Sequence, residues 1–385
     1  MPTKFDVFAE IIEKAPCKQK DLGFRVPVYI HIKSLEESSF IKKTGSGYLP
    51  IKSKKTELIF KIIKECIKRN LNYNFFLKKN LVNVISNINK SQPNIRPDKY
   101  KGNQKVLQYL GYLEENQFIL KWKLRPARGT LLKHSLLENL FNLNNLNAKL
   151  KSTFLNSGKL NKLMKRMPEH QINPFEKDFF EHIAGSAQLE GSTVSIGETI
   201  EILTKEIYPD KKQVEIQMIK NLNEALIYVL NNFDEGLASE HIKVLNEKIM
   251  FSLHRGAGKF KQTQNRIQGN PHFKTTVPKL VPVEIEKFCN TFNEIENKED
   301  ALESMGRLHN DFQRIHPFPD GNSRTTRAII IWLLIKFKLP PVVLKAGSFE
   351  TYMNLTKLAV HRSDEELTRF LKHILIHENL HKMIV

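Results

Sequence analysis

The chain has 385 residues, of which 41% are hydrophobic and 26% are charged. This composition excludes collagen-like, wholly disordered and disulfide-scaffold proteins, and the length allows two to three domains. The three cysteines are far apart and form no zinc-binding spacing, which predicts a reducing compartment and no structural metal. The most apolar run, residues 328–335, is too short to cross a bilayer, and the N-terminal residues do not resemble a signal peptide. We therefore predict a cytoplasmic protein without a membrane partner.

Positive charge is concentrated at one end of the chain. The formal net charge is +19, and residues 1–150 contain 28 basic and 12 acidic side chains, which leaves only +3 for the remainder. Such asymmetry is typical of a module that binds nucleic acid or another anionic surface. Residues 51–165 are also rich in Asn, Lys and Ile, a bias that an AT-rich genome produces without selection for binding. Both interpretations remain open from the sequence.

Residues 1–130 are predicted to form a small basic α+β domain. A short helix at 5–14 precedes a β-rich stretch at 24–32, and residues 117–124 have the pattern of a strand. Apolar residues at helical spacing predict three further helices, within 56–70, 74–88 and 103–113. Three helices followed by a hairpin, with surplus lysine, is the order of a winged helix, although any small α+β domain can have it.

The remainder of the chain is predicted to be helical. Leu and Phe recur every three or four residues in 131–173, which predicts a connecting helix or a pair of helices. Residues 174–385 contain at least seven helical patterns, which predicts an all-α domain and a mainly α fold class. No repeat of fixed period is present, so a solenoid is not expected.

The stretch 308–337 predicts a helix, a loop and a second helix, and the loop contains reactive side chains. His316 follows the first helix, where an imidazole with a pKa near neutrality can act as a general base. Asp320 is a hard oxygen ligand suited to Mg²⁺. The ring of Phe318, between two prolines, is expected to fill the core and fix the loop.

The start of the second helix is expected to bind an anion. Gly321 and Asn322 offer backbone N–H groups at a helix N-terminus. Arg324 and Arg327 lie three residues apart on one helix face. Each feature alone is more often structural, but their coincidence within twelve residues predicts a phosphate-handling site.

This loop resembles the signature HPFx(D/E)GNxRxxR of the Fic (filamentation induced by cAMP) family. The sequence HPFPDGNSRTTR, residues 316–327, fits every fixed position, and the resemblance covers roughly residues 175–380. It implies a Fic-type helical domain with a β-hairpin flap. It also implies an Mg²⁺-dependent nucleotidyltransferase that moves AMP from ATP to a Ser, Thr or Tyr hydroxyl of a target protein or of the chain itself.

The resemblance assigns roles to the loop residues. His316 would deprotonate the attacking hydroxyl, and Asp320 would hold Mg²⁺ between the α- and β-phosphates. The anion hole would consist of Gly321 and Asn322. Arg324 would bind the phosphates of ATP, and Arg327 would bind the γ-phosphate.

Two further positions follow from the same comparison. Ser323 stands where the commonest family form has Gly. A Cβ there would crowd the phosphates or disfavour a positive φ by about 1 kcal/mol, whereas Ser as an N-cap would open the following helix; we expect catalysis to survive with an altered rate. Tyr352 falls where relatives have tyrosines and would line the adenine pocket.

A second motif upstream resembles the family's inhibitory motif, (S/T)xxxE(G/N), placed before the core as in its second class. Ser186, Glu190 and Gly191 match it, on a helix expected at about 181–191. Glu190 is expected to form a bidentate bridge with Arg327 and so to block the guanidinium that the γ-phosphate of ATP needs. The alternative is that this segment is an ordinary helix end.

Between the two motifs, residues 258–282 resemble the family's target-binding flap. The Gly-x-Phe-Arg of the family appears as Gly-Lys-Phe-Lys at 258–261, which keeps a positive charge but not a bidentate one. A strand edge would be offered to the target by β-augmentation. That edge comprises Asn265, Arg266, Ile267, Gln268 and Gly269.

The sequence thus predicts an autoinhibited protein adenylyltransferase with a basic accessory domain at 1–130, a connector at 131–173 and a Fic domain at 174–385. One alternative is a nucleic-acid-binding regulator whose basic N-terminal domain is the main working part. Another is a Fic enzyme that transfers UMP, GMP, phosphate or phosphocholine. Many relatives form homodimers, and no feature of this sequence decides whether this chain does.

Overall fold

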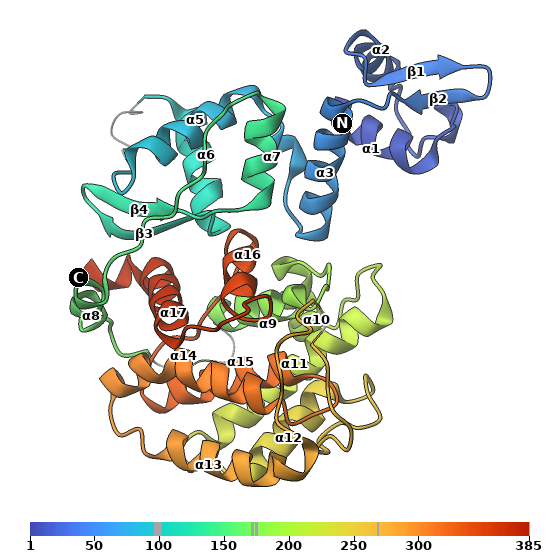
Figure 1. The fold of residues 1–385 in the computed structure, drawn as a ribbon. Coiled ribbons are helices and arrows are strands. Elements are labelled where there is room, and N and C mark those ends of the chain that lie inside the picture. Colours follow the sequence, from blue (N-terminus) through green and yellow to red (C-terminus); the bar gives the residue numbers. More distant parts are fainter. Residues whose placement is uncertain (96–101, 171–172, 174–175, 268, 385) are drawn as a thin grey trace. The chain divides into compact units, whose positions relative to one another are not determined.

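The computed structural model describes residues 1–95, 102–170, 173, 176–267 and 269–384 (Figure 1). These residues form mostly helices, with two separate two-stranded antiparallel sheets, so the predicted mainly α class is confirmed. The chain divides into two compact units, Met1–Lys90 with Lys133–Leu150, and Ser91–Leu132 with Lys151–Val385. The predicted domain boundaries at residues 130 and 173, and the winged helix, stay predictions.

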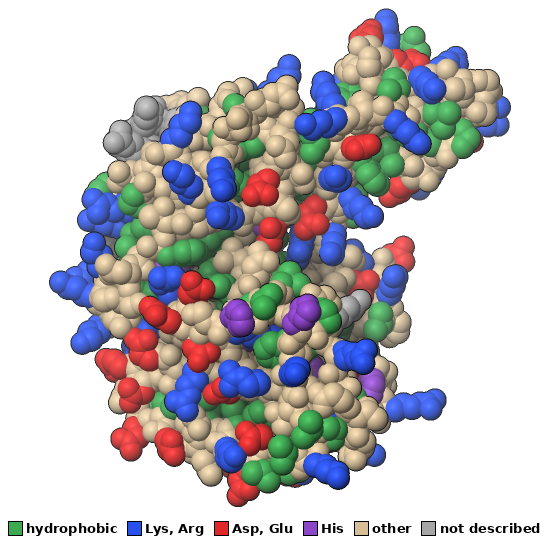
Figure 2. Space-filling model, viewed as in Figure 1, with side chains coloured by type: hydrophobic (Ala, Val, Ile, Leu, Met, Phe, Trp, Pro, Cys, Tyr) green, Lys and Arg blue, Asp and Glu red, His purple; other side chains and the backbone are tan. Residues whose placement is uncertain are grey.

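The first unit contains a small apolar core whose buried residues lie between Val7 and Ile63. Its elements are α1 (Lys4–Lys14), α2 (Tyr29–Glu37), β1 (Ile41–Thr44), β2 (Gly47–Pro50), α3 (Lys54–Lys68), α4 (Tyr73–Phe76), α5 (Lys79–Ser91) and α7 (Ser135–Leu143). On the face drawn in Figure 2, lysine and arginine side chains are dispersed over the surface rather than gathered in one stripe.

The β-rich stretch predicted at 24–32 was wrong, because Tyr29–Glu37 form helix α2. Val28, Ile32 and Leu35 are the buried residues of this stretch, and they recur every three or four positions. That spacing places them on one helical face, packed against α1. The β-branched residues favoured a strand locally, but burial against α1 selected the helix.

The second unit begins with α6 (Gln104–Glu115) and the hairpin of β3 (Ile119–Leu124) and β4 (Ala127–Leu131), in which Ile119 faces Leu131. Strand β3 packs against α17 (Asp364–Asn379), where the amide of Lys121 donates to Nδ1 of His377 at 3.0 Å. The predicted strand at 117–124 is therefore confirmed.

The rest of the second unit is helical, which confirms the prediction of at least seven helices after residue 174. Its elements are α8 (Ser157–Met164), α9 (Lys177–Leu189), α10 (Ile196–Lys205), α11 (Gln213–Asn232), α12 (Ser239–Met250), α13 (Val281–Asn293), α14 (Lys298–Ile315), α15 (Asn322–Lys336), α16 (Ala346–Leu355) and α17. In the described ranges, none of the helices has the length and apolar character needed to cross a membrane.

Helix α15 is the centre of this unit and positions the candidate site. Its residues from Asn322 to Ile335 are almost all buried, as expected for a helix that is apolar on every side. It packs against α11, α12 and α14. Because the core holds α15 on all sides, the side chains of its first turns have fixed positions.

Close packing of α14 on α17 gives a test of the fold. A Cβ on Gly306 would lie 2.2 Å from the carbonyl oxygen of Asp364 and 2.5 Å from Oγ1 of Thr368. We expect Gly306→Ala to lower the free energy of unfolding by about 1–3 kcal/mol, because the two helices must separate. Gly111→Ala is the matched control, since this helical glycine has open space around it. Thermal unfolding should show a lower midpoint only for Gly306→Ala; equal midpoints would contradict the packing.

Candidate functional site

The loop between α14 and α15 is rigid because its own side chains tie it down. His316 ends α14 in the left-handed conformation (φ 48°, ψ 59°) and its amide donates to the carbonyl of Phe312 at 2.8 Å. The ring of Phe318 is fully buried, as predicted. The Asn322 carboxamide accepts from the amide of Phe318 at 2.9 Å and donates to its carbonyl at 2.8 Å. The side chain of Asn322 therefore shapes the loop.

Gly321 is required at the start of α15 for two reasons. Its φ of 81° is in the left-handed region, and a Cβ would lie 2.6 Å from the Met250 side chain. Its amide donates to Oδ1 of Asp320 at 2.6 Å, so this N–H is already paired. The anion hole predicted from Gly321 and Asn322 stays a prediction, and the amide of Asn322 belongs to the first turn of α15, where backbone N–H groups lack intrahelical acceptors.

The predicted site residues surround a cavity of about 340 Å³. It brings the signature loop, the inhibitory glutamate and the flap to one place. The predicted residues that line it are Glu190, Asn265, Arg266, Ile267, His316, Asp320, Gly321, Asn322, Ser323 and Arg324. Of the others, Ser186, Gly191, Gly269, Arg327 and Tyr352 are not among its lining residues, and Gln268 lies outside the described residues.

His316 has the environment of a neutral base. Burial lowers its pKa to about 4, and the charge of Lys261 contributes to the shift. Nδ1 of His316 finds no hydrogen-bond partner in the described part of the chain. The ring is therefore unprotonated at pH 7, and the residue lines the cavity.

Asp320 and Arg324 line the cavity with opposite charges. The Asp320 side chain is 58% exposed, and its Oδ1 lies 3.6 Å from Nη2 of Arg324. Arg324 is buried and its Nε has no hydrogen-bond partner among the residues that the structure describes. A buried guanidinium with unused donors at a helix N-terminus is suited to bind an anion.

The inhibitory motif contacts Arg327, as predicted, but with a different geometry. Nη2 of Arg327 donates to Oε1 of Glu190 at 2.8 Å and to the carbonyl of Ser186 at 3.1 Å, and Nε donates to Oγ of Ser186 at 2.8 Å. The expected bidentate bridge is thus wrong, because Ser186 takes the other donors. Burial raises the pKa of Glu190, but the charges of Arg327 and Arg324 outweigh this and hold it below its usual value.

Helix α9 places this carboxylate at its end. Glu190 is the C-cap residue, and Gly191 follows with a φ of 96°. A glycine in the left-handed region after the C-cap is a common helix ending. Gly191 therefore ends the helix where Glu190 can reach Arg327.

Tyr352 lies behind Arg327 and does not line the cavity of His316. Its hydroxyl bonds to Nε2 of His309 at 2.7 Å, and both residues border a small void of about 20 Å³ together with Arg327. Burial raises the pKa of Tyr352 and so keeps the hydroxyl neutral. An adenine-lining role for Tyr352 stays a prediction.

Ser323 does not cap α15, contrary to one of the two expectations. Gly321 is the N-cap, and Ser323 is the second residue of the helix. Ser323 is not among the residues with positive φ, so its Cβ introduces no backbone strain. The side chain lines the cavity.

The predicted flap is an extended loop in this structure. In the described residues from 258 to 277, no strand is formed. Nδ2 of Asn265 donates to the carbonyl of Phe318 at 2.8 Å, and the amide of Lys261 donates to that of Pro317 at 2.8 Å. Within the described residues, the main chain of 263–267 makes one hydrogen bond, from Asn270 to Ile267. The segment therefore lies against the signature loop with most of its main-chain groups unused.

Several residues of the site could not be found from sequence. Lys357, in the segment after α16, and Gln313, on α14, line the cavity. Asn246 is fully buried on α12 and joins the loop to the flap: it donates to the carbonyl of Asp320 at 3.0 Å and accepts from the amide of Gly258 at 3.0 Å. The sequence indicates Lys261 only as a residue that keeps the positive charge of the family motif.

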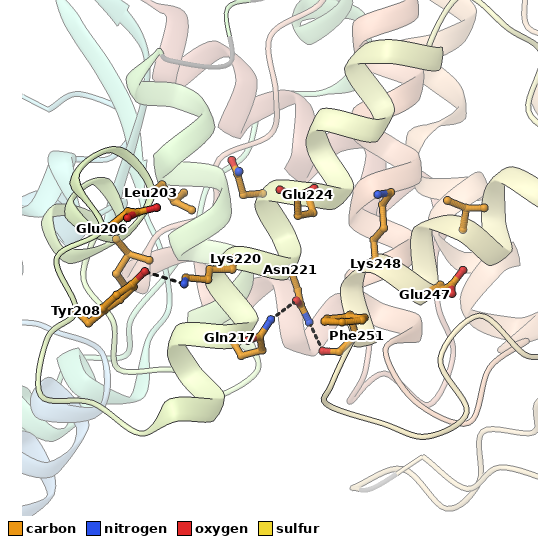
Figure 3. A pocket seen from close by; sticks show the side chains of 13 residues that line it. Leu203, Glu206, Tyr208, Gln217, Lys220, Asn221, Glu224, Glu247, Lys248 and Phe251 are labelled. Atoms are coloured by element: carbon orange, nitrogen blue, oxygen red, sulfur yellow. Dashed lines mark hydrogen bonds between the residues drawn. The ribbon is translucent and has the colours of Figure 1, made fainter.

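A larger cavity, of about 670 Å³, lies between α10, α11 and α12 (Figure 3). Nζ of Lys220 donates to the hydroxyl of Tyr208 at 2.9 Å, and Nδ2 of Asn221 donates to the carbonyl of Phe251 at 2.7 Å. None of the predicted site residues lines this cavity. Volume alone therefore does not mark the candidate site.

Comparison with known proteins identifies the region that contains the site. Residues 236–334 match the model of the Fic/DOC family. A protein adenylyltransferase Fic from Nematostella vectensis is 28% identical over 203 residues, which are 50% of this chain and 46% of the relative. One from Drosophila grimshawi is 25% identical over 201 residues, 50% of this chain and 40% of the relative. The chain thus spans less than half the length of these relatives.

A solved Fic domain containing signaling protein from Bacteroides thetaiotaomicron aligns with a TM-score of 0.49 and 19% identity, over 59% of this chain and 94% of that one. The matched residues 236–334 include both the flap segment and the whole signature from His316 to Arg327. The part of the chain that contains the candidate site is therefore similar to the Fic/DOC family.

Proposed function

We propose that the chain is an autoinhibited protein adenylyltransferase, which transfers AMP from ATP to a Ser, Thr or Tyr hydroxyl of a target protein or of its own chain. Relatives that match half of it are named protein adenylyltransferases. The observation that carries the proposal is that His316, Asp320 and Arg324 line the same cavity. A base, a carboxylate able to hold a metal and a cation around one cavity are the groups that nucleotidyl transfer needs.

The reaction would use His316 as the base. Its neutral imidazole accepts the proton of the attacking hydroxyl. The hydroxyl oxygen bonds to the α-phosphorus of ATP, and the bond from that phosphorus to the oxygen bridging to the β-phosphate breaks. The products are the AMP ester of the hydroxyl and pyrophosphate, and the proton stays on His316 until solvent removes it.

Charge on the phosphates would be stabilised by the start of α15. Arg324 and the first residues of α15 line the cavity at the N-terminal end of the helix, where the helix dipole also favours an anion. These groups are already in place, so little reorganisation is needed as charge develops. Arg327 would bind the γ-phosphate only after its contact with Glu190 is broken.

The residues present fit a magnesium ion. The Asp320 carboxylate lines the cavity and is more than half exposed. It is the one carboxylate of residues 316–327. Mg²⁺ is commonly held by one or two carboxylates, with phosphates and water as its other ligands. When bound, the ion would neutralise phosphate charge, and Asp320 would be its protein ligand.

The flap would hold the target. Its segment 263–267 lies beside His316 with unused main-chain donors and acceptors. An extended peptide of the target can pair with such a segment and bring a hydroxyl to the base. A cytoplasmic location stays a prediction from the sequence, nucleic-acid binding by the accessory region at 1–130 stays its alternative, and whether the chain forms a homodimer stays open.

Intact mass spectrometry tests the reaction and its donor together. The Glu190→Gly protein is incubated with Mg²⁺ and, separately, ATP, UTP, GTP or CDP-choline, and released pyrophosphate is assayed in parallel. We expect the chain to gain the mass of one AMP with ATP, and the Asp320→Ala control to lose most of this gain. Gain of another group would establish the alternative donor. Neither a mass gain nor pyrophosphate with any donor would overturn the proposal.

A further inference from the structure

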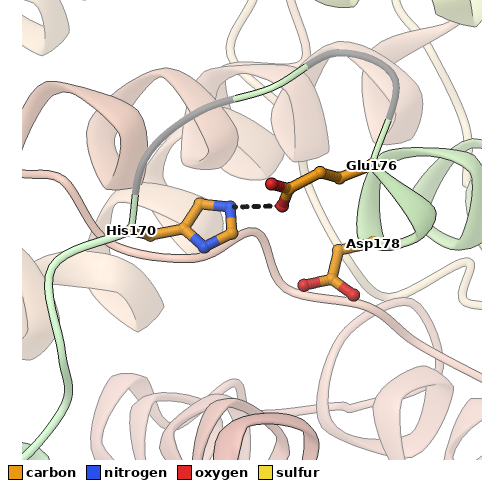
Figure 4. A group of neighbouring side chains, drawn as sticks. All are labelled: His170, Glu176 and Asp178. Atoms are coloured by element: carbon orange, nitrogen blue, oxygen red, sulfur yellow. Dashed lines mark ion pairs between the residues drawn. The ribbon is translucent and has the colours of Figure 1, made fainter. Parts of the chain in front are cut away.

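Three side chains that can bind a metal ion meet outside the cavity of His316. His170, Glu176 and Asp178 each offer one ligand atom, and these atoms lie within 4.8 Å of one another (Figure 4). Nε2 of His170 is 3.8 Å from Oε2 of Glu176. This distance is too long for a hydrogen bond. It is near the spacing of about 3.4 Å between two ligands of one tetrahedral ion with bonds of about 2.1 Å.

The histidine is the unusual member of this group. Only 9% of His170 is exposed, and its Nε2 has no hydrogen-bond partner among the described residues. Its own amide donates to the carbonyl of Lys338 at 2.8 Å, which fixes its backbone. A buried polar atom without a partner is unfavourable and therefore calls for an explanation.

The two carboxylates alone would need no metal. Glu176 is the N-cap of α9 and Asp178 lies in its first turn, where the helix dipole favours negative charge. Nζ of Lys382 also lies 3.5 Å from Oδ2 of Asp178 and partly balances it. Neither fact explains why a buried, unpaired imidazole nitrogen faces both carboxylates.

We propose that His170, Glu176 and Asp178 bind one divalent first-row transition ion, with Zn²⁺ as the preferred ion. One imidazole and two carboxylates are ligands that Zn²⁺ accepts, and a fourth, tetrahedral position would be filled by water. The ion would join the segment of His170 to the first turn of α9. That helix ends at Glu190, so the site would stabilise the helix that carries the inhibitory motif.

Equilibrium dialysis against Zn²⁺, followed by metal analysis, tests the site in the full-length chain. The experiment uses the Asp320→Ala protein without nucleotide, so that the other proposed metal ligand is absent. We expect one Zn²⁺ per chain and a thermal unfolding midpoint that rises with Zn²⁺ concentration. Affinity should fall at least about tenfold in His170→Ala and Glu176→Gln, since each removes a direct ligand.

Two further variants separate the site from adventitious binding. Lys382→Ala removes the competing ammonium and should raise Zn²⁺ affinity, and His272→Ala, an exposed histidine elsewhere, should leave it unchanged. Equal affinity in Glu176→Gln, Asp178→Asn and the parent would overturn the proposal, even if His170→Ala failed to fold. So would the absence of stoichiometric Zn²⁺ in the parent protein.

Discussion

Glu190→Gly is expected to raise the rate of AMP transfer by about 10- to 100-fold. The carboxylate occupies Nη2 of Arg327 at 2.8 Å, the donor proposed for the γ-phosphate. A hydrogen bond to a charged group contributes about 1.5–3 kcal/mol, and 1.4 kcal/mol corresponds to a tenfold change. Its removal increases the fraction of the protein that can bind ATP productively by that factor.

The fold should survive this substitution because Arg327 keeps other partners. The hydroxyl and the carbonyl of Ser186 still accept from its guanidinium. Glu190→Gln should give a smaller increase, since the amide oxygen can still accept but a neutral hydrogen bond contributes only about 0.5–1.5 kcal/mol. Ser186→Ala should have little effect on the rate, because it leaves the carboxylate in place.

The inhibition should not respond to mild acid. The pKa of Glu190 in the folded protein is below its ordinary value of 4.5, so the contribution of its contact with Arg327 is full above that ordinary value. It is lost only as the pH falls through the lowered pKa. The ratio of the Glu190→Gly rate to the wild-type rate should therefore be constant from pH 6 to pH 8.

Initial rates with α-labelled ATP, at an ATP concentration below saturation, measure the effect. Glu294→Gly is the matched control, because Glu294 is also a C-cap glutamate but is exposed at the end of α13, away from the cavity. Its rate should equal that of the wild type. Equal rates for Glu190→Gly and Glu294→Gly would show that the contact seen in the structure does not inhibit.

Local patterns were sufficient to predict much of this structure. The apolar residues of α15 and the turn residues around Phe318 form one continuous stretch, so the helix, the loop and a ring suited to burial could be predicted from it. The error at α2 has the opposite origin. There, β-branched residues favour a strand, and only packing against α1 reveals that Ile32 and Leu35 share a helical face.

The candidate site could also be predicted only where its residues are neighbours in the sequence. The signature loop is continuous in sequence, so its residues could be named in advance. Lys357 lines the same cavity and Asn246 bonds to the carbonyl of Asp320, and no local pattern links either residue to His316. The hydrogen bonds of Arg327 could not be predicted from the sequence either. The orientation of α9 places the hydroxyl and the carbonyl of Ser186 where both accept from its guanidinium.

His316→Ala, made in the Glu190→Gly protein so that the rate is measurable, is expected to lower AMP transfer by about 10²- to 10⁴-fold. This is the usual contribution of a positioned general base. The substitution should leave ATP binding nearly unchanged, because Arg324 and the first turn of α15 remain. The exposed His381→Ala is the control and should retain the full rate.

The pH dependence distinguishes a base from a merely structural histidine. The pKa of His316 is about 4, so protonation should reduce the rate only near pH 4, and the rate should be level from pH 6 to pH 7. A histidine with its ordinary pKa of 6.5 would already be half protonated within that range.

Lys261 makes this test specific, because its charge is one cause of the lowered pKa of His316. Lys261→Met should move the acid limb of the rate profile to higher pH, whereas Lys261→Arg, which keeps the charge, should not. Lys261 also donates to the carbonyl of Ile315 at 3.3 Å, so a purely structural role would lower the rate at every pH without moving the limb. An acid limb that stays in place in Lys261→Met, or a full rate in His316→Ala, would remove His316 from the chemistry.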